Sequence, residues 1–493
     1  MTIITIFIRV GLAALVLTGI IGYLKKQKSW IMSFAQNFTG ILFIFSGAVK
    51  AVDPLGTAYK MEQYFAEFES VFAETWFSFL APLFPVFNEY SISFSLLMII
   101  FEIVLGIFLI LGHAKKLTSW AFFLLVVFFT FLTGFTFLTG YVPDDVNFFN
   151  FGGWGPYVET NMKVTDCGCF GDFIKLEPKI SFYKDLVLLV PSVYFIWKYS
   201  DMHTLFNTKT ERIIGGVSII GLLIYCFSNF AWDIPHIDFR PFQEGVNIRT
   251  TKEAEVNALI NARTLGVTLT NRENEQVVEL PYDQYLKEYK NYPEKEYVID
   301  YIVEEPAVAQ TKISEFEIAD LDGNDVTQDL ISDTNYSFMI ISHKMKYKTS
   351  KALVTVPDSI YTIDTVLVEG TDEMQVVRSL DMVEQRQIDQ DEYTFDKTQY
   401  DAYANIVNPF LAKAEKDAMY AAAVVKYDSE SMINDFRHAT QAAYPFYVAD
   451  DILLKTIVRS NPGIVLLRNG EIIKKWHYKK LPSYEEVKEQ FLK

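Results

Sequence analysis

Six long apolar stretches in the first half of the chain limit what it can fold into. Each has about the 17–25 residues that a helix needs to cross the hydrocarbon core of a bilayer. They lie near residues 3–24, 32–52, 91–112, 118–140, 182–199 and 212–231. The fifth is the weakest, because Lys184, Asp185 and Pro191 interrupt it. The first has neither a basic segment before it nor a small-residue cleavage site, so we interpret it as a retained helix. Residues 1–231 are therefore predicted to form an all-α membrane bundle of six spans.

The second half of the chain has a different composition. Residues 1–231 carry a net charge of −1, whereas residues 232–493 carry −16 of the total of −17. A chain that is 50% hydrophobic as well as acidic is neither a nucleic-acid-binding protein nor a disordered tail. Three cysteines exclude a small disulfide-stabilised scaffold and a cysteine zinc cluster, and the six histidines are scattered, so no metal site is expected. Cys226 lies within the sixth span and is interpreted as a small apolar filler.

Basic residues in short loops predict the orientation of the spans. The loops after the first, third and fifth spans are basic and are placed in the cytoplasm. Their basic side chains are Lys25, Lys26, Lys28, His113, Lys115, Lys116, Lys198, Lys209 and Arg212. The acidic loops 53–90 and 141–181 are predicted outside, with the N-terminus and all residues after about 232. We therefore expect a multi-pass protein surrounded by membrane lipid in the cell inner membrane, with its C-terminal domain in the periplasm. Residues 63–88 are expected to form an interfacial amphipathic helix.

Three charged side chains fall in or at the ends of the predicted spans, where a charge is costly and is usually paired or functional. Glu102 lies in the middle of the third span, Arg9 in the outer half of the first, and Lys50 at the outer end of the second. One interpretation is a structural ion pair between Arg9 and Glu102, with the Lys50 ammonium group extended to the membrane surface. The other is a polar pocket that accepts a proton or the head group of a quinone.

The loop between the fourth and fifth spans contains the run Asp166-Cys167-Gly168-Cys169-Phe170-Gly171-Asp172. The intervening glycine makes a disulfide between Cys167 and Cys169 possible, but such a disulfide would be strained and easily reduced. A closed loop this small adds little stability, so we favour a redox role over a loop staple or two buried thiols. The flanking aspartates disfavour thiolates, and Lys163 or Lys50 are candidates to offset them.

These motifs together resemble the DoxX/MauE group of membrane proteins. The resemblance covers roughly residues 30–200 and rests on Phe43–Gly47, Lys50–Gly56, Phe101–Gly106 and the Cys-Gly-Cys-Phe-Gly run. It implies a four-helix, redox-linked core. Relatives in this group are associated with quinone-linked thiosulfate oxidation, with disulfide formation during maturation of methylamine dehydrogenase, and with defence against thiol oxidative stress. The group is functionally mixed, so the substrate is not fixed. The extra spans and the long tail suggest a version specialised in Bacteroidota-like bacteria.

The soluble half begins with a linker, and residues 232–309 as a whole form a linker and a small α/β segment. A helix is expected at 252–263, followed by short strands. From about residue 310, strands and helices alternate. Strands are expected at 313–318, 337–342, 421–427 and 464–467, and helices at 399–419, 429–442 and 482–493. Pro409 is expected to kink the first of these three helices.

This order resembles an α/β thioredoxin-like domain over residues 310–493, with Pro462 at its cis-proline position. The departure from the family is decisive, because no cysteine follows Cys226 and His343–Lys346 stands where the family keeps Cys-x-x-Cys. A polar, acidic insertion at about 345–398 interrupts the fold. The domain cannot exchange thiols itself. We interpret it as a platform that docks a client protein or the cysteine loop, or as an inert folded cap.

The leading functional hypothesis from the sequence is thiol–disulfide exchange at the membrane. Cys167 and Cys169 would cycle between dithiol and disulfide. Electrons would pass to a quinone held near Arg9, Lys50 and Glu102, and the tail would dock a periplasmic or envelope client protein. The alternative, favoured by the cysteine-free tail, is a non-enzymatic scaffold or assembly factor for a cell-envelope complex.

Overall fold

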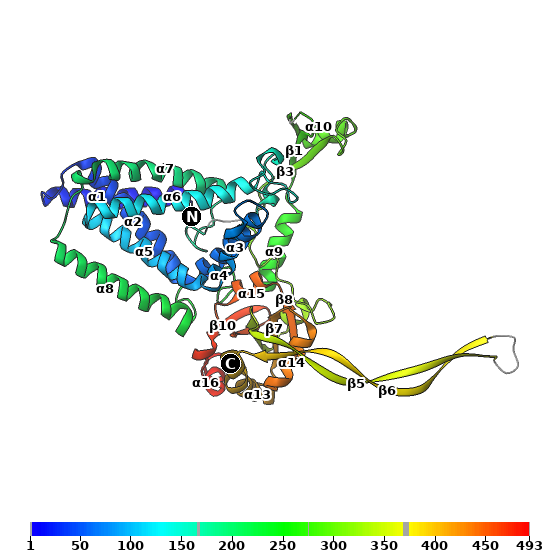
Figure 1. Cartoon of the computed structure of the whole chain (residues 1–493). Coiled ribbons are helices and arrows are strands. Elements are labelled where there is room, and N and C mark those ends of the chain that lie inside the picture. Colours follow the sequence, from blue (N-terminus) through cyan, green and yellow to red (C-terminus); the bar gives the residue numbers. More distant parts are fainter. Residues whose placement is uncertain (1, 165–167, 275, 368–373, 493) are drawn as a thin grey trace. The chain divides into compact units, whose positions relative to one another are not determined.

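The chain forms two compact units that interleave along the sequence (Figure 1). The computed structural model describes residues 2–164, 168–274, 276–367 and 374–492. The first unit comprises Met1–Phe316 and two segments that return to it late in the sequence, Thr456–Ser460 and Gly470–Lys480. The remaining residues form the second unit, namely Glu317–Lys455, Asn461–Asn469 and Leu481–Lys493.

The first unit contains, in the described part of the chain, six helices that are long and apolar enough to cross a membrane. They are α1 (Ile3–Tyr23), α2 (Trp30–Val52), α5 (Ser91–Leu111), α6 (Lys115–Thr139), α7 (Pro178–Lys198) and α8 (Thr208–Phe227). Each coincides with a predicted span, so the predicted multi-pass helical part is confirmed. The fifth span, the weakest prediction, is also a helix, since α7 continues through Pro191. Proline is tolerated inside such helices where neighbouring groups satisfy the freed backbone.

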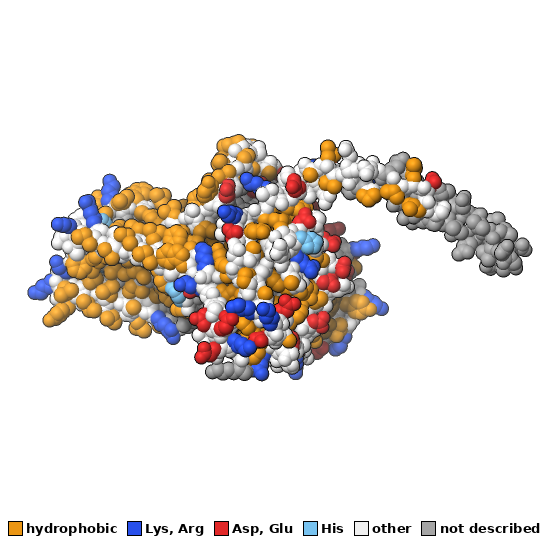
Figure 2. Space-filling view, turned by 90° about the horizontal axis from the view of Figure 1, so that it is seen from below, with side chains coloured by type: hydrophobic (Ala, Val, Ile, Leu, Met, Phe, Trp, Pro, Cys, Tyr) orange, Lys and Arg blue, Asp and Glu red, His pale blue; other side chains and the backbone are white. Residues whose placement is uncertain are grey.

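Exposed apolar side chains cover the outside of these helices, as the face in view in Figure 2 illustrates. On α1, for example, Ile4, Leu12 and Val16 are 60–67% exposed. Soluble proteins rarely expose an apolar surface of this extent. The outward faces of the helices therefore suit contact with lipid.

Helices α2 and α5 approach each other closely at two glycines. A Cβ atom added to Gly40 would lie 2.8 Å from the carbonyl oxygen of Gly106, and one added to Gly106 would lie 2.7 Å from that of Gly40. Only glycine fits there without moving a helix, which is the small-residue packing typical of membrane helices. The same two helices carry Lys50 and Glu102, whose side chains form an ion pair.

The three basic loops lie together at one end of the bundle. Lys28, in the first of them, donates a hydrogen bond to the carbonyl of Ser200 at 2.9 Å. His113, in the second, lies 2.9 Å from the Glu211 carboxylate at the start of α8. The predicted alternation of basic and acidic loops along the chain therefore corresponds to two ends of one helical bundle.

The two acidic loops meet at the opposite end. Asn147, in the second loop, donates a hydrogen bond to the carbonyl of Val71 in the first, at 2.9 Å. Asn229, at the end of the last span, donates to the carbonyl of Ala51 at the end of α2, at 3.1 Å. The cysteine loop belongs to this end.

The first acidic loop differs from the prediction of one amphipathic helix over residues 63–88. It forms α3 (Pro54–Ala73) and a short α4 (Leu83–Glu89). The helix α3 starts early because Asp53 caps it, accepting a hydrogen bond from the backbone N–H of Gly56 at 3.2 Å, and because a proline follows the cap.

After the last span, the first unit continues as a small α/β segment. It contains α9 (Ile248–Ile260) and a three-stranded antiparallel sheet in the order β2-β1-β3. The strands are β1 (Thr264–Asn271), β2 (Val277–Pro281) and β3 (Tyr297–Val303), and the connecting helix is α10 (Tyr282–Glu288). Val267 and Leu269 on β1 pack with Tyr285 in a core of their own. The late strand β10 (Glu471–His477) returns here, since Ile472 exchanges backbone hydrogen bonds with Gly245 and Val246.

The second unit is built on a mixed sheet in which four strands follow the order β9-β4-β7-β8. These are β4 (Tyr336–Ser342), β7 (Tyr420–Lys426), β8 (Phe446–Ala449) and β9 (Gly463–Arg468). Strand β4 is parallel to β7 and antiparallel to β9, and β7 is parallel to β8. The helices are α11 (Thr327–Ser332), α12 (Lys397–Ala402), α13 (Asn408–Lys416), α14 (Glu430–Thr440), α15 (Asp451–Ile457) and α16 (Tyr484–Phe491). A C-terminal mixed α/β sheet domain is therefore present.

Two elements predicted after residue 310 differ from the structure. Residues 313–318 form a turn and irregular backbone and not a strand, and Ala319 makes isolated bridges to Asp325 and Val448. The helix predicted over 399–419 is divided into α12 and α13 by a wider π-turn at Tyr403–Val407, directly before the Pro409 that was expected to kink it. The Asn461–Pro462 peptide bond is cis.

The predicted insertion at 345–398 is a long two-stranded antiparallel hairpin (Figure 1). Its strands are β5 (Tyr347–Leu367) and β6 (Met374–Phe395). The base of the hairpin is held by aromatic contacts, since the Phe395 ring lies 5.0 Å from that of Phe436 on α14. Farther out, Leu353 is 71% exposed.

Candidate functional site

The candidate site is the cysteine loop together with the buried charges beneath it. Cys167 lies outside the described residues, so the predicted pair is represented by Cys169. The carbonyl of Cys169 accepts a hydrogen bond from the Ser46 hydroxyl of α2 at 2.7 Å. Of the described cysteines, Cys169 and Cys226 carry free thiols. Cys226 is fully buried in an apolar cluster, as expected for a filler.

The loop is fixed on both sides of Cys169. Gly168 adopts a positive φ of 60°, which glycine tolerates best, and a Cβ atom there would lie 3.1 Å from the Lys60 side chain. Phe170 is buried in the core of the bundle, with its ring 6.0 Å from that of Phe45. The backbone on either side of the thiol is therefore held by the helices.

Lys184 places a positive charge at the Cys169 thiol. Its Nζ lies 3.5 Å from Cys169 Sγ and 2.6 Å from Asp185 Oδ1, and both charged side chains are at most 9% exposed. The second carboxylate oxygen of Asp185 accepts a hydrogen bond from the Thr133 hydroxyl of α6 at 3.0 Å. These contacts link the thiol to two membrane helices through one chain of polar groups.

The electrostatic balance at Cys169 is mixed. Burial is the largest influence and raises the pKa of the Cys169 thiol above its usual range. Lys184 opposes this both through its charge and through its hydrogen bond, Asp185 adds to it, and Lys50 opposes it more weakly. The net direction is upward, so Cys169 is not an activated thiolate at neutral pH. Lys184 supplies the local compensation once a negative charge forms on the sulfur.

The expected pairing of the intramembrane charges is corrected by the structure. Glu102 pairs with Lys50, with 2.5 Å between Oε2 and Nζ, and not with Arg9. Lys50 is only 4% exposed and lies over the Phe129 ring, so it does not extend to the membrane surface. Arg9 is exposed on α1. The predicted group of three is therefore reduced to the Lys50–Glu102 pair.

A third buried cation, Arg459, holds the outer edge of the loop. Its Nε lies 2.9 Å from the Asp53 carboxylate, and its Nη2 lies 3.2 Å from that of Asp172 in the cysteine loop. The guanidinium group also lies over the Tyr59 ring, and the side chain is 5% exposed. One residue from the late segment of the first unit thus joins the end of α2 to the cysteine loop.

Sequence reasoning missed Lys184, Asp185 and Arg459 as site residues. The first two were treated only as interruptions of a span. The rule that flagged Glu102, by which a charge inside a membrane helix is usually functional, would have flagged them as well. The Arg459 contact joins residues 287 positions apart, and no local pattern marks it. Lys163, a predicted partner of the cysteines, pairs with Asp144 instead.

Two buried donors, Lys50 and Ser181, have hydrogen-bonding capacity left, which is what a quinone carbonyl would need. The Lys50 ammonium group has three N–H donors and gives one to Glu102. Ser181 lies one turn before Asp185 on α7, is fully buried, and its hydroxyl has no hydrogen-bond partner in the described structure. A buried hydroxyl without a partner is costly and offers a hydrogen bond to a ligand. For metals, the described residues contain no group of three or more His, Cys, Asp or Glu side chains that would hold an ion.

Comparison of the chain with protein-family models, with curated proteins and with solved structures finds no match in any of the three. The DoxX/MauE and thioredoxin-like resemblances therefore remain predictions from the sequence.

Proposed function

We propose that this chain is a membrane thiol–disulfide exchange protein of the DoxX/MauE type, in which Cys167 and Cys169 form the reversible disulfide. The observation that carries the proposal is the contact of 3.5 Å between the Lys184 ammonium group and Cys169 Sγ. A buried cation beside a cysteine stabilises a thiolate, which is the species that forms when a disulfide opens.

The two cysteines take different roles in this proposal. Because the Lys184 ammonium group lies 3.5 Å from Cys169 Sγ, Cys169 suits the leaving position, where Lys184 neutralises the charge as it forms and offsets the effect of burial. Cys167 is then the sulfur that the client attacks. A client thiolate bonds to Cys167, the Cys167–Cys169 bond breaks, and Cys169 leaves as the thiolate.

A second client thiolate completes the exchange by attacking the client sulfur of the mixed disulfide. The client disulfide forms, the bond to Cys167 breaks, and Cys167 leaves as a thiolate. The client has lost two electrons, and the Cys167–Cys169 pair has gained them. The two protons of the client thiols end on the two cysteines. Return to the disulfide requires loss of two electrons and two protons, which a quinone bound near Lys50, Glu102 and Ser181 would accept.

The soluble half serves in this proposal as a docking platform of the thioredoxin-like type. Its central strands and helices support that assignment, and the absence of cysteine after Cys226 removes any exchange chemistry of its own. The charge asymmetry and the basic loops support a location in the cell inner membrane, with this domain in the periplasm.

The proposal is tested by trapping thiol states in intact cells. Cys169→Ser should accumulate a mixed disulfide between Cys167 and a client, visible on a non-reducing gel after acid quenching and alkylation. Cys167→Ser should show none, and Cys226→Ser should behave as wild type. If both single variants oxidise clients as well as wild type, the exchange function is wrong.

The second candidate is a non-enzymatic scaffold for an envelope complex, favoured by the lack of cysteine in the soluble half. A full chain carrying both Cys167→Ser and Cys169→Ser would then still recover one stoichiometric partner from the membrane. Loss of that partner in the double variant would exclude the scaffold.

A further inference from the structure

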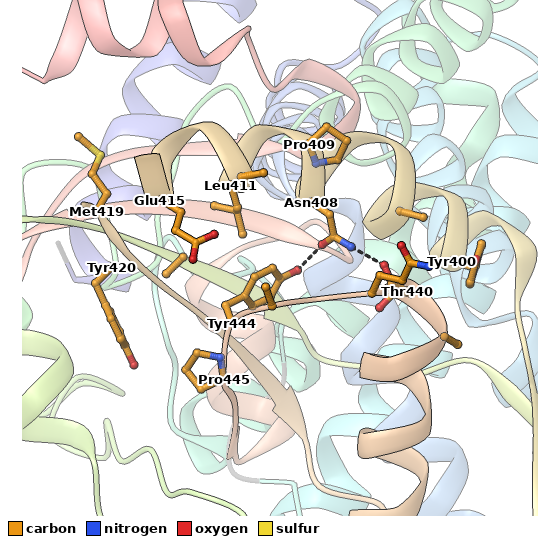
Figure 3. Close-up of a pocket in the computed structure, with 16 residues that line it drawn as sticks. Tyr400, Asn408, Pro409, Leu411, Glu415, Met419, Tyr420, Thr440, Tyr444 and Pro445 are labelled. Carbon is orange, nitrogen blue, oxygen red and sulfur yellow. Dashed lines mark hydrogen bonds between the residues drawn. The ribbon is translucent and has the colours of Figure 1, made fainter. Parts of the chain in front are cut away.

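The second unit contains a pocket of about 550 Å³ that the cysteine chemistry does not use (Figure 3). This volume lies in the range of small-molecule and side-chain binding sites. The pocket is bounded by α13, by the end of α14 and by the start of β7. Its walls include Tyr420, Tyr444 and the carboxylate of Glu415.

The pocket has one formal charge, and that charge is negative. Glu415 is exposed, and its carboxylate makes neither a hydrogen bond nor an ion pair within the described structure. No lysine, arginine or histidine is among the described residues that line the pocket. Lys413, two residues earlier on the same helix, is engaged by Glu485 at 2.9 Å. Glu415 also lies in the last turn of α13, where the helix dipole favours a cation.

The inner wall of the pocket is held in place by hydrogen bonds. The Tyr444 hydroxyl donates to Asn408 Oδ1 at 2.8 Å, and Asn408 Nδ2 donates to the carbonyl of Thr440 at 2.6 Å (Figure 3). Tyr444 is 9% exposed, whereas Tyr420 at the rim is 36% exposed. A fixed aromatic wall beside a carboxylate is the combination that binds alkylammonium and guanidinium groups, because the ring face and the carboxylate both attract a cation.

We propose that this pocket binds a cationic ammonium or guanidinium group, with the Glu415 carboxylate as its counter-ion and the Tyr420 and Tyr444 side chains as its walls. Such a group is carried by a lysine or arginine side chain of a partner polypeptide or by a free organic amine. The net charge of −16 on residues 232–493 would attract a basic partner at long range. The proposal does not depend on the cysteines, and its test leaves them unchanged.

The test uses the full-length protein in detergent micelles and isothermal titration calorimetry. The probes are a blocked pentapeptide Gly-Gly-Lys-Gly-Gly, its isosteric neutral analogue with norleucine in place of lysine, and n-butylammonium. We expect the lysine peptide to bind and the norleucine peptide to bind at least about tenfold more weakly, since the charge–charge contact is lost. Binding of the lysine peptide should weaken as salt is added.

Variants separate the pocket from general electrostatic attraction. Glu415→Gln should weaken binding of the lysine peptide by about tenfold, and Tyr420→Leu should weaken it by several fold. Glu489→Gln, an exposed carboxylate on α16 outside the pocket, is the matched control and should have no effect. Thermal unfolding of Glu415→Gln should match wild type, because the residue is exposed.

The probes also distinguish the two sources of the cation. Tighter binding of the lysine peptide than of n-butylammonium assigns the pocket to a polypeptide, and equal or tighter binding of n-butylammonium assigns it to a free amine. Equal binding of the lysine and norleucine peptides, or unchanged binding in Glu415→Gln, would overturn the proposal.

Discussion

Lys184 is the strongest influence that favours a negative charge on Cys169. In the variant Lys184→Gln/Asp185→Asn, which removes both charges and so leaves no unpaired carboxylate, the pKa of Cys169 should rise further. Disulfide exchange at pH 7 should then slow by roughly tenfold and recover at higher pH, because less leaving thiolate is stabilised. The measurement is the pH profile of client oxidation, with the exposed Lys179→Gln as control. An unchanged profile would exclude a role for Lys184 in the exchange.

Substitution of Arg459 should destabilise the fold, because its guanidinium group pairs with two carboxylates, Asp53 and Asp172. Arg459→Gln leaves Asp53, which is 13% exposed, without its cation. Breaking one partner of a buried ion pair costs about 3–5 kcal/mol, so the free energy of unfolding should fall by that order. Denaturant titration in micelles measures it. Arg468→Gln, at an exposed position on β9, should change the free energy of unfolding by less than about 0.5 kcal/mol.

His477 makes the returning part of the first unit sensitive to acid. Burial, assisted by the neighbouring Lys479, lowers the pKa of His477 to about 4, from the ordinary value of about 6.5. The unfolded chain therefore binds a proton between these values when the folded chain does not, and stability falls as pH falls from 6.5 to 4. The loss is about 3 kcal/mol at most. The measurement is the free energy of unfolding of wild type and of His477→Gln between pH 6.5 and 4, and their difference gives the contribution of His477. His438→Gln, at an exposed position, should show the same pH dependence as wild type.

Single residues show clearly what the sequence could and could not predict. Lys50 and Glu102 were both noticed in the sequence, because a charge in an apolar stretch is a local feature. Their pairing was missed because hydropathy does not say which helices are neighbours. The contact between α2 and α5 depends on Gly40 and Gly106, whose meaning appears only in three dimensions.

Among the elements, the β5–β6 hairpin contributes least to the fold of the second unit. Beyond the pair Lys351↔Asp391, side chains such as Leu353 and Leu380 are more than half exposed. Replacing residues 352–390 by Asn-Gly, which suits a two-residue hairpin turn, should therefore change the free energy of unfolding by less than about 1 kcal/mol. Circular dichroism during thermal denaturation would measure this, and a loss of several kcal/mol would show that the hairpin supports the fold.

Element boundaries followed the sequence where local signals were strong. Strand β4 and helix α14 lie within a residue or two of their predictions, because an unbroken apolar run and a serine cap mark them. The prediction of a strand at 313–318 was wrong, because closely spaced apolar residues also occur in a turn. Here the turn and the residues after it bury Ile313, Phe316 and Ile318. Periodicity over six residues does not distinguish these outcomes.

For the whole molecule, the predicted orientation gives a direct labelling test. In a background with Cys167 and Cys169 replaced by serine, Lys175→Cys lies in the second acidic loop and Ser200→Cys in a basic loop, and both positions are exposed. A membrane-impermeant maleimide added to intact spheroplasts should label only Lys175→Cys, and lysis should expose Ser200→Cys as well. The reverse pattern would invert the proposed orientation and remove the oxidising environment from the cysteines.

Hydropathy predicted the six spans well, since each is a local property of about twenty residues. The interleaving of the two units along the chain could not be predicted from the sequence. Residues 456–480 alternate between the units, and nothing in their composition signals these crossings.

The late position of Arg459 has a consequence for biogenesis. Asp172 and Arg459 are separated by 287 residues, which take about 15–60 s to synthesise at about 5–20 residues per second. During that interval the nascent bundle lies in the bilayer with the Asp53 and Asp172 carboxylates unpaired with Arg459 and without the link between α2 and the cysteine loop. The ion pairs of Arg459 with Asp53 and Asp172 form only once synthesis has passed residue 459. A ribosome that stalls earlier therefore leaves a membrane-inserted chain without them.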